Sequence, residues 1–243
     1  MAQLNIGIAD AKNIDQTTRR TITIGYEDNW INRLMLPKIV AELAQMTTEK
    51  IEIKLHLTSS NSNLEELLNQ KIDILFLIQN SALGVSSVVY HELYRSPFIS
   101  IVNRDSKLAD NAAVKLADLQ TQRLLYLNPA AAPLEMEKIQ QQFLKLINND
   151  NYIYTDSALS ACIKTAADQG IVAIIPDIIP PHIEAIKLLA LDDQLPFNGV
   201  SFGMAMCKKD YQKPAYHQIF KRVVSIYQHS EKTISEFRQS LYQ

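Results

Sequence analysis

The feature that most constrains the fold is an ordered alternation of strand-like and helix-like segments in the first third of the chain. Residues 21–26 and 51–57 alternate apolar and polar side chains, the period of a half-buried strand. Residues 72–78 form a nearly continuous apolar run, which is typical of a strand buried on both faces. Between these segments, apolar residues recur at helical spacing over 31–46 and 64–69. This order predicts right-handed crossovers and a parallel sheet.

A second set of strand-like and helix-like segments repeats this organisation. Its strands are expected over 123–127, 152–154 and 170–176, and its helices over 134–147 and 158–167. A strand over 199–207 is then expected to return to the first set, before an amphipathic helix over 215–227. A chain of 243 residues can hold two small domains that share a cleft. The sequence therefore predicts an α/β fold with two Rossmann-like lobes and a central cleft.

Three residues predict local geometry within these segments. Pro37 falls inside the first helix, so that helix is expected to begin late or to bend. Gly170 precedes the most apolar strand of the second set, and its missing Cβ suits a helix-ending turn. Trp30 begins the first helix, where packing with a satisfied indole N–H is favoured over a place in the cleft lining.

Polar loops follow the strands of the first set. Ligands of parallel sheets bind beyond the carboxyl ends of the strands, near helix N-termini. The loops expected there span 26–30, 58–63 and 78–81, and all three are rich in small hydrogen-bonding side chains. These loops therefore predict a binding rim for a small molecule.

Composition and charge exclude several classes of function. A formal net charge of −2, with no dense run of basic residues, offers no general attraction for nucleic acid. No run approaches the ~20 apolar residues that span a bilayer, and the N-terminus does not read as a signal peptide. Neither the two cysteines nor the five histidines have metal-ligand spacing. We therefore expect a cytoplasmic protein without metal or cofactor, in which Cys162 and Cys207 are buried, inert thiols.

Residues 199–203 match the Gly-x-Ser-x-Gly pattern of serine hydrolases. That pattern requires a strand before the serine and a helix after it. Here the residues after Ser201 continue to alternate as a strand does. Catalysis at Ser201 is therefore disfavoured, and the protein is not expected to be an enzyme.

The order of these motifs resembles the effector-binding domain of LysR-type transcriptional regulators. The resemblance is carried by the strand ending in Ile24-Gly25, by Leu36-Pro37 in the first helix, and by the Leu-rich unit over 60–77. In the second half it is carried by 116–119 and by the run from Ala166 to Pro176. It covers roughly residues 20–228 and implies a periplasmic-binding-protein type 2 fold. The implied parts are a tail or linker remnant over 1–20, lobe I over 21–98 and 200–228, lobe II over 99–199, and a helical tail over 229–243.

The resemblance also implies which residues hold the effector. In the family the effector lies between the lobes and contacts the loops after the strands. Carried over to this sequence, the ligand-binding residues are Asp28, Asn29, Ser59, Ser60, Asn61, Asn80, Asn128, Pro129, Tyr154, Ser157 and Pro176. Hydroxyls, amides and free N–H groups at helix starts suit a carboxylate or another anion. The alternative for Asp28 and for the serines and asparagine over 59–61 is that they only cap helices.

The implied function is the sensing of a small-molecule effector, a polar or weakly acidic metabolite. The family forms homodimers, and it contacts DNA only through an N-terminal helix-turn-helix domain that the polar residues 1–20 cannot form. The chain is therefore expected to be an excised effector domain or a stand-alone sensor. Two alternatives stay open: a solute-binding protein of a transporter with the same fold, and an enzyme acting through Ser201.

Overall fold

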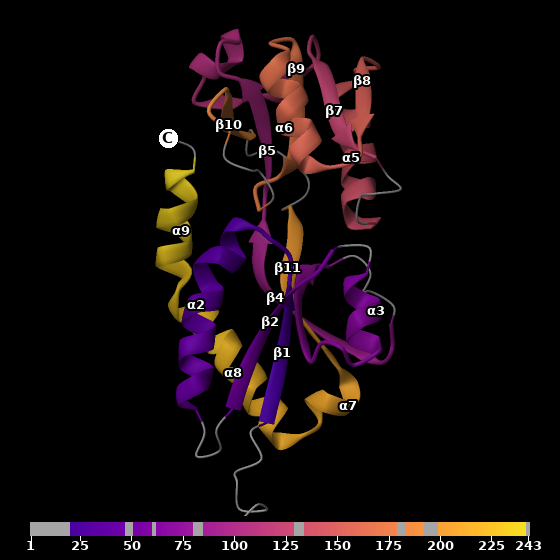
Figure 1. The fold of residues 1–243 in the computed structure, drawn as a ribbon. Helices are drawn as coiled ribbons and strands as arrows, with labels where there is room; N and C mark the ends of the chain where they lie inside the picture. The colour runs from indigo at the N-terminus through magenta and orange to yellow at the C-terminus, as the bar shows by residue number, and fades with distance from the viewer. Residues whose placement is uncertain are drawn as a thin grey trace, which may run out of the picture.

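The chain folds into two α/β lobes stacked end to end (Figure 1). The structure is a computed structural model, and it describes residues 20–46, 51–59, 62–79, 85–128, 134–178, 183–191 and 199–241. Each lobe is built around one sheet, and we name the lobe with the five-stranded sheet lobe I and the lobe with the six-stranded sheet lobe II. The predicted α/β fold with two Rossmann-like lobes is confirmed.

Lobe I contains the predicted parallel strands, within a mixed sheet. Its strand order is β2-β1-β3-β11-β4. The strands are β1 (Arg20–Tyr26), β2 (Ile51–Leu57), β3 (Ile74–Ile78), β4 (Val88–Ser96) and β11 (Val200–Cys207). β1 runs parallel to β2 and β3, whereas β11 runs antiparallel to its neighbours β3 and β4. Segments from both halves of the chain therefore complete this one sheet.

Helices cover both faces of the lobe I sheet. They are α2 (Trp30–Gln45), α3 (Asn63–Leu68), α7 (Lys208–Tyr211) and α8 (Pro214–His229). Alternate side chains of β3 point to opposite faces: Phe76 joins the core that includes α2 and α8, and Leu75 joins a second core with Leu67 of α3. β3 is thus buried on both faces, as its apolar run predicts. Helix α2 begins at Trp30 and runs through Pro37, so the expected late start is wrong.

Lobe II is a mixed sheet in the order β6-β10-β5-β9-β7-β8. Its strands are β5 (Phe98–Asn103), β6 (Ala113–Val114), β7 (Arg123–Leu127), β8 (Tyr152–Thr155), β9 (Ile171–Pro176) and β10 (Ile186–Leu191). Its helices are α4 (Leu116–Leu119), α5 (Leu134–Ile147), α6 (Ala158–Ala167) and the 3₁₀ helix η1 (Lys107–Asp110). β7, β8 and β9 are parallel, and β5 pairs antiparallel with β9 and β10.

The two glycines that adjoin strands have different roles. Gly199, directly before β11, has φ +94°, and a Cβ there would lie 2.0 Å from the carbonyl oxygen of Ser96. Gly170 does not adopt a positive φ, and a Cβ there would meet only the Asp168 side chain, at 3.3 Å. The turn before β9 therefore makes no use of the conformational freedom of Gly170.

A final helix, α9 (Glu231–Ser240), follows α8 after Ser230. Figure 1 shows it in yellow beside α2, with the C-terminus close to lobe II. Ile234 is its one buried residue. The helix therefore lies along the outside of the molecule and reaches from lobe I towards lobe II.

Candidate ligand-binding cleft

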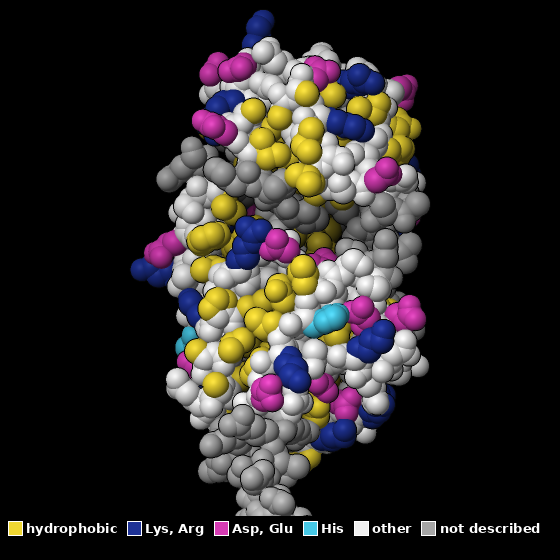
Figure 2. Space-filling model, viewed as in Figure 1, with side chains coloured by type: hydrophobic (Ala, Val, Ile, Leu, Met, Phe, Trp, Pro, Cys, Tyr) yellow, Lys and Arg dark blue, Asp and Glu magenta, His cyan; other side chains and the backbone are white. Residues whose placement is uncertain are grey.

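The carboxyl ends of the parallel strands in the two lobes face each other. Trp30 follows β1 and Asp177 follows β9, and the indole Nε1 of Trp30 donates to the carbonyl oxygen of Asp177 at 2.9 Å. Because β2 and β3 run parallel to β1, and β7 and β8 parallel to β9, all of these strands end at the junction of the lobes. Figure 2 shows the surface hollowed between the lobes. The sheets thus direct both sets of loops into one cleft.

Two of the predicted residues cap helices that start at this junction. The side chain of Asn29 accepts a hydrogen bond from the N–H of Asn32 at 2.9 Å and caps α2. Ser157 accepts from the N–H of Ser160 at 3.1 Å and caps α6. Asn29, rather than Asp28, is therefore the cap of α2, and Ser157 is the cap of α6. The remaining N–H groups of the first turns of α2 and α6 are natural donors to an anion.

Asp28 and Ser59 are also engaged locally. The Asp28 carboxylate accepts two hydrogen bonds from Arg33, both at 2.7 Å, and this contact lowers the pKa of Asp28. The Ser59 hydroxyl lies 3.0 Å from that of Ser62, and the Ser59 carbonyl accepts from the N–H groups of Ser62 and Asn63. Asp28 and Arg33 therefore form an exposed ion pair whose charges cancel. Ser59 stabilises the turn that leads into α3.

Three of the predicted lobe II residues lie at or near the ends of the neighbouring strands β7, β8 and β9. The Asn128 side chain donates to Asp156 at 3.2 Å, which links the loops after β7 and β8. Tyr154 on β8 is 40% exposed, and desolvation raises its pKa, with smaller contributions from Tyr152 and Glu137. Pro176 is buried at the end of β9, opposite Phe98 in the sheet. Of these, Asn128 and Tyr154 present polar groups at the surface.

The remaining predicted ligand-binding residues lie outside the described part of the chain. They are Ser60, Asn61, Asn80 and Pro129. Their roles stay predictions.

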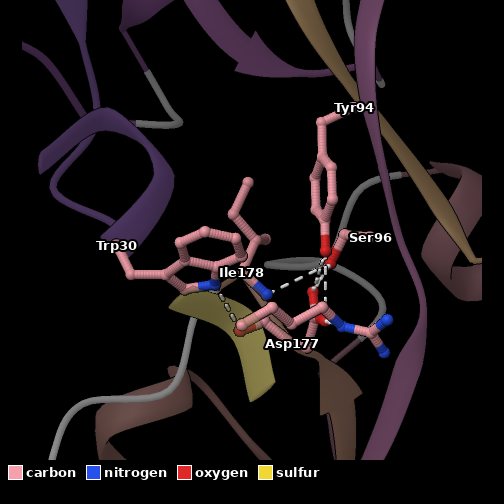
Figure 3. A network of polar contacts seen from close by, with 6 residues as sticks. Trp30, Tyr94, Ser96, Asp177 and Ile178 are labelled. Atoms are coloured by element: carbon pink, nitrogen blue, oxygen red, sulfur yellow. Dashed lines mark hydrogen bonds and ion pairs between the residues drawn. The ribbon is translucent and has the colours of Figure 1, made fainter. Parts of the chain in front are cut away.

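A buried polar cluster at the junction was not predicted from the sequence. We name Trp30, Tyr94, Ser96, Asp177 and Arg238 the hinge cluster (Figure 3). The Asp177 carboxylate accepts from the Ser96 hydroxyl at 2.7 Å, from Tyr94 at 3.2 Å and from the Arg238 Nε at 2.5 Å. The backbone N–H of Asp177 donates to the Pro97 carbonyl at 2.9 Å. One residue of lobe II is thus held by several residues of lobe I and by α9.

The Asp177 side chain is almost fully withdrawn from water, with 2% of it exposed. Burial raises its pKa, and the donors Ser96, Arg238 and Tyr94 oppose that rise. A buried carboxylate requires such partners, because an unpaired buried charge is strongly unfavourable. The only sequence signal was an acidic residue directly after an apolar strand, and nothing in the sequence pairs Asp177 with Arg238, which lies 61 residues later.

The serine-hydrolase pattern does not form a nucleophile elbow. Ser201 is fully buried within β11, and its hydroxyl lies 2.9 Å from that of Tyr90 on the neighbouring strand. The strand continues to Cys207, as the alternation of its residues predicts. A strand at this position does not present the serine at a strand-to-helix turn.

Both cysteines are buried thiols, as expected, and they lie in different lobes. Desolvation raises the pKa of Cys162 to about 12 and also raises the pKa of Cys207. Thiols with raised pKa values are poor nucleophiles and poor metal ligands at neutral pH. Among the residues that the structure describes, no three His, Cys, Asp or Glu side chains come together as metal ligands.

Comparisons with known proteins point to one family. A sequence model of the family described as LysR substrate binding domain matches residues 15–225. The fold resembles HinK, a LysR family transcriptional regulator from Pseudomonas aeruginosa, with a TM-score of 0.65 and 15% identity over 92% of this chain and 76% of that chain. No match was found among curated proteins.

Two further solved structures are effector-binding domains with a ligand. One is the BenM effector binding domain with its effector benzoate, with a TM-score of 0.66 and 16% identity over 87% of this chain and 94% of that chain. The other is the effector binding domain of QuiR in complex with shikimate, with a TM-score of 0.62 and 17% identity over 88% of this chain and 99% of that chain. The predicted periplasmic-binding-protein type 2 fold is confirmed.

Proposed function

Because the chain belongs to the family of LysR substrate-binding domains, we propose that the cleft between its lobes binds a polar or weakly acidic metabolite. The chain is an effector-sensing domain of a LysR-type transcriptional regulator. One observation supports the proposal above all: the carboxyl ends of the parallel strands of lobe I face those of lobe II. The hydrogen bond from Trp30 to Asp177 connects the two lobes there. No feature of the chain favours the transporter alternative.

The chemistry at the strand ends supports a carboxylate-bearing effector. The N-termini of α2 and α6 both lie at the junction, and free N–H groups and the positive end of a helix dipole favour an anion. The ligands in the BenM and QuiR structures, benzoate and shikimate, both carry a carboxylate. We propose Asp28, Asn29, Ser59, Asn128, Tyr154, Ser157 and Pro176 as lining residues, together with Ser60, Asn61, Asn80 and Pro129.

Sensing requires no chemical step. An effector that binds one arrangement of the lobes more tightly than another shifts the population towards that arrangement. In a complete regulator, that shift would reach DNA through a helix-turn-helix domain, and such a regulator would act in the cytoplasm. The family is one of regulatory ligand-binding domains, and we propose that this chain binds its effector without converting it.

The proposed effector class can be tested with the one tryptophan of the chain. Trp30 is 8% exposed and contacts Asp177 across the junction, so a change in lobe arrangement should alter its fluorescence. We expect a panel of small carboxylates, with their amides as neutral controls, to yield a ligand that changes this emission. At 100 times its Kd, such a ligand should add roughly 2.7 kcal/mol to the free energy of unfolding.

Matched asparagine variants locate the site. Asn128→Ala should weaken binding of the identified carboxylate about tenfold, because it removes a donor at the cleft. Asn69→Ala is the control, because Asn69 is exposed after α3, at the amino ends of the strands. Equal affinities for wild type, Asn128→Ala and Ser157→Ala would place the site elsewhere. Binding of the amides and not the acids would contradict the proposed class.

We also propose that two copies pair through one face of the molecule. Exposed large apolar side chains include Leu159 and Ile163 on α6, each 54% exposed, and Leu55 and Leu57 on β2, 49% and 60% exposed. In Figure 2, hydrophobic side chains gather on one face, over α6 in lobe II and over α2 and β2 in lobe I. A two-fold axis would place the α6 face of one copy on the β2 face of the other.

Charged substitutions on α6 test this pairing. Leu159→Asp and Ile163→Asp should shift the protein from dimer to monomer at micromolar concentration, because each would bury an unpaired carboxylate. Leu146→Asp is the control, since Leu146 is 45% exposed on α5 of the same lobe. Sedimentation-velocity centrifugation distinguishes the species. A wild-type monomer at high concentration, or dissociation by Leu146→Asp alone, would contradict the proposal.

A further inference from the structure

Helix α9 contacts both lobes. Phe237 stacks on Trp30 of lobe I, with ring centroids 5.6 Å apart and planes inclined by 24°. Arg238, the next residue, binds Asp177 at the end of β9 in lobe II. The helix therefore touches the two lobes at the point where they meet.

Open pockets lie beside this row of contacts, one towards each lobe. A cavity of about 370 Å³ separates it from β4 and α8 of lobe I, and another of about 370 Å³ separates it from β10 of lobe II. Ser235 and Arg238 line both cavities. Ile234, Phe237 and Arg238 fall at helical spacing on one side of α9 and attach it, and Leu241 after its end also packs against the core.

The charge contact is asymmetric. The Asp177 carboxylate is 2% exposed, whereas 35% of the Arg238 side chain is exposed. On release, Arg238 would regain water, whereas the buried Asp177 carboxylate would lose a charged donor, which is unfavourable. A contact of this kind therefore favours the docked helix and ties α9 to lobe II.

We propose that α9 is a strap that holds the two lobes in the observed arrangement, through Arg238 on Asp177 and Phe237 on Trp30. The match to the family ends at residue 225, so α9 adds to the part of the chain that the family match describes. The strap is a property of the ligand-free protein. Its consequence for sensing rests on the proposed function: an effector that alters the lobe arrangement would act against the strap, and release would change its apparent affinity.

Two measurements on the ligand-free full chain test the strap. The first is the distance between two spin labels, one at Lys71→Cys in lobe I and one at Lys145→Cys in lobe II, both exposed positions. Labelled protein is diluted into unlabelled protein, so that only distances within one molecule are measured. The native cysteines are buried and should not take up label. The second is hydrogen exchange of the α9 amides. The variants are Arg238→Gln and Phe237→Ala, with Lys232→Ala as the control.

Lys232 lies on the same helix, is 89% exposed and makes only a surface ion pair with Glu236, at 3.8 Å. We expect Arg238→Gln and Phe237→Ala each to speed α9 exchange about tenfold and to broaden or shift the label distance. Lys232→Ala should leave both readouts unchanged. Faster α9 exchange with an unchanged label distance would contradict the proposal, because the helix would then not determine the arrangement of the lobes. Unchanged exchange would overturn it as well. Neither result depends on identifying an effector.

Discussion

Gly199→Ala is expected to destabilise the protein severely. Gly199 has φ +94°, and an added Cβ would lie 2.0 Å from the Ser96 carbonyl oxygen and 2.7 Å from the Cα of Pro97. These are backbone atoms at the crossing between the lobes, so no flexible side chain can yield. Backbone strain and overlap together should lower the free energy of unfolding by about 4 kcal/mol or more. That is a large part of the roughly 5–15 kcal/mol that stabilises a typical domain.

Gly170→Ala is the matched control for this effect. Gly170 also precedes a strand, but a Cβ there would approach only the Asp168 side chain, at 3.3 Å. We expect a change within about 0.5 kcal/mol, typical of a surface substitution. Urea unfolding followed by circular dichroism measures both variants. A Gly199→Ala protein as stable as Gly170→Ala would show that the crossing does not require a glycine.

Trp30→Ala should produce the second largest loss, about 4 kcal/mol in the free energy of unfolding. The ring is 8% exposed and packs between Tyr94 and Phe237, each with its ring centroid 5.6 Å away. Its removal opens a cavity and also leaves the Asp177 carbonyl without the indole donor. Because the fluorophore itself is lost, circular dichroism is the appropriate probe.

Trp30→Phe separates packing from hydrogen bonding at this position. It keeps an aromatic ring but removes the donor to Asp177, so we expect a smaller loss of about 1–2 kcal/mol. The Phe variant should also speed the hydrogen exchange of α9 less than the Ala variant, since stacking on Phe237 is partly kept. Equal losses for both variants would mean that the ring contributes little beyond its N–H group.

The sequence was most informative where burial and periodicity agree. The apolar run ending at Ile78 became a strand buried on both faces, and the alternation after Ser201 became β11 rather than a hydrolase turn. Both predictions follow from which side chains must avoid water. Trp30 was also predicted to pack with a satisfied N–H group, and it does.

Local signals were less reliable. Pro37 predicts that α2 begins late or bends, and the late start is wrong, because the helix starts seven residues before Pro37 and continues through it. Tertiary packing of its apolar face can override a local breaker. Gly170 suits a helix-ending turn on sequence grounds, although Gly199 is the glycine with the left-handed backbone. A sequence indicates that a turn is near but not which residue adopts the unusual φ angle.

The hinge cluster could not be predicted, because it joins residues from four separate elements. Trp30, Ser96, Asp177 and Arg238 come from α2, β4, the end of β9 and α9. Pairwise charge complementarity does not identify one partner for Asp177 among 24 Lys and Arg residues. The gathering of the loops at the strand ends was foreseeable, since the ends of parallel strands meet at one edge of each sheet.

The position of β11 has a consequence for how the protein is made on the ribosome. β11 lies between β3 and β4, and all eight of its residues are buried. Lobe I therefore cannot complete its sheet until residues 200–207 have been synthesised, more than a hundred residues after β4. The strands of lobe II are contiguous in the chain and can pair while synthesis continues. The lobe that begins first should thus finish folding last, with the edges of β3 and β4 exposed in the meantime.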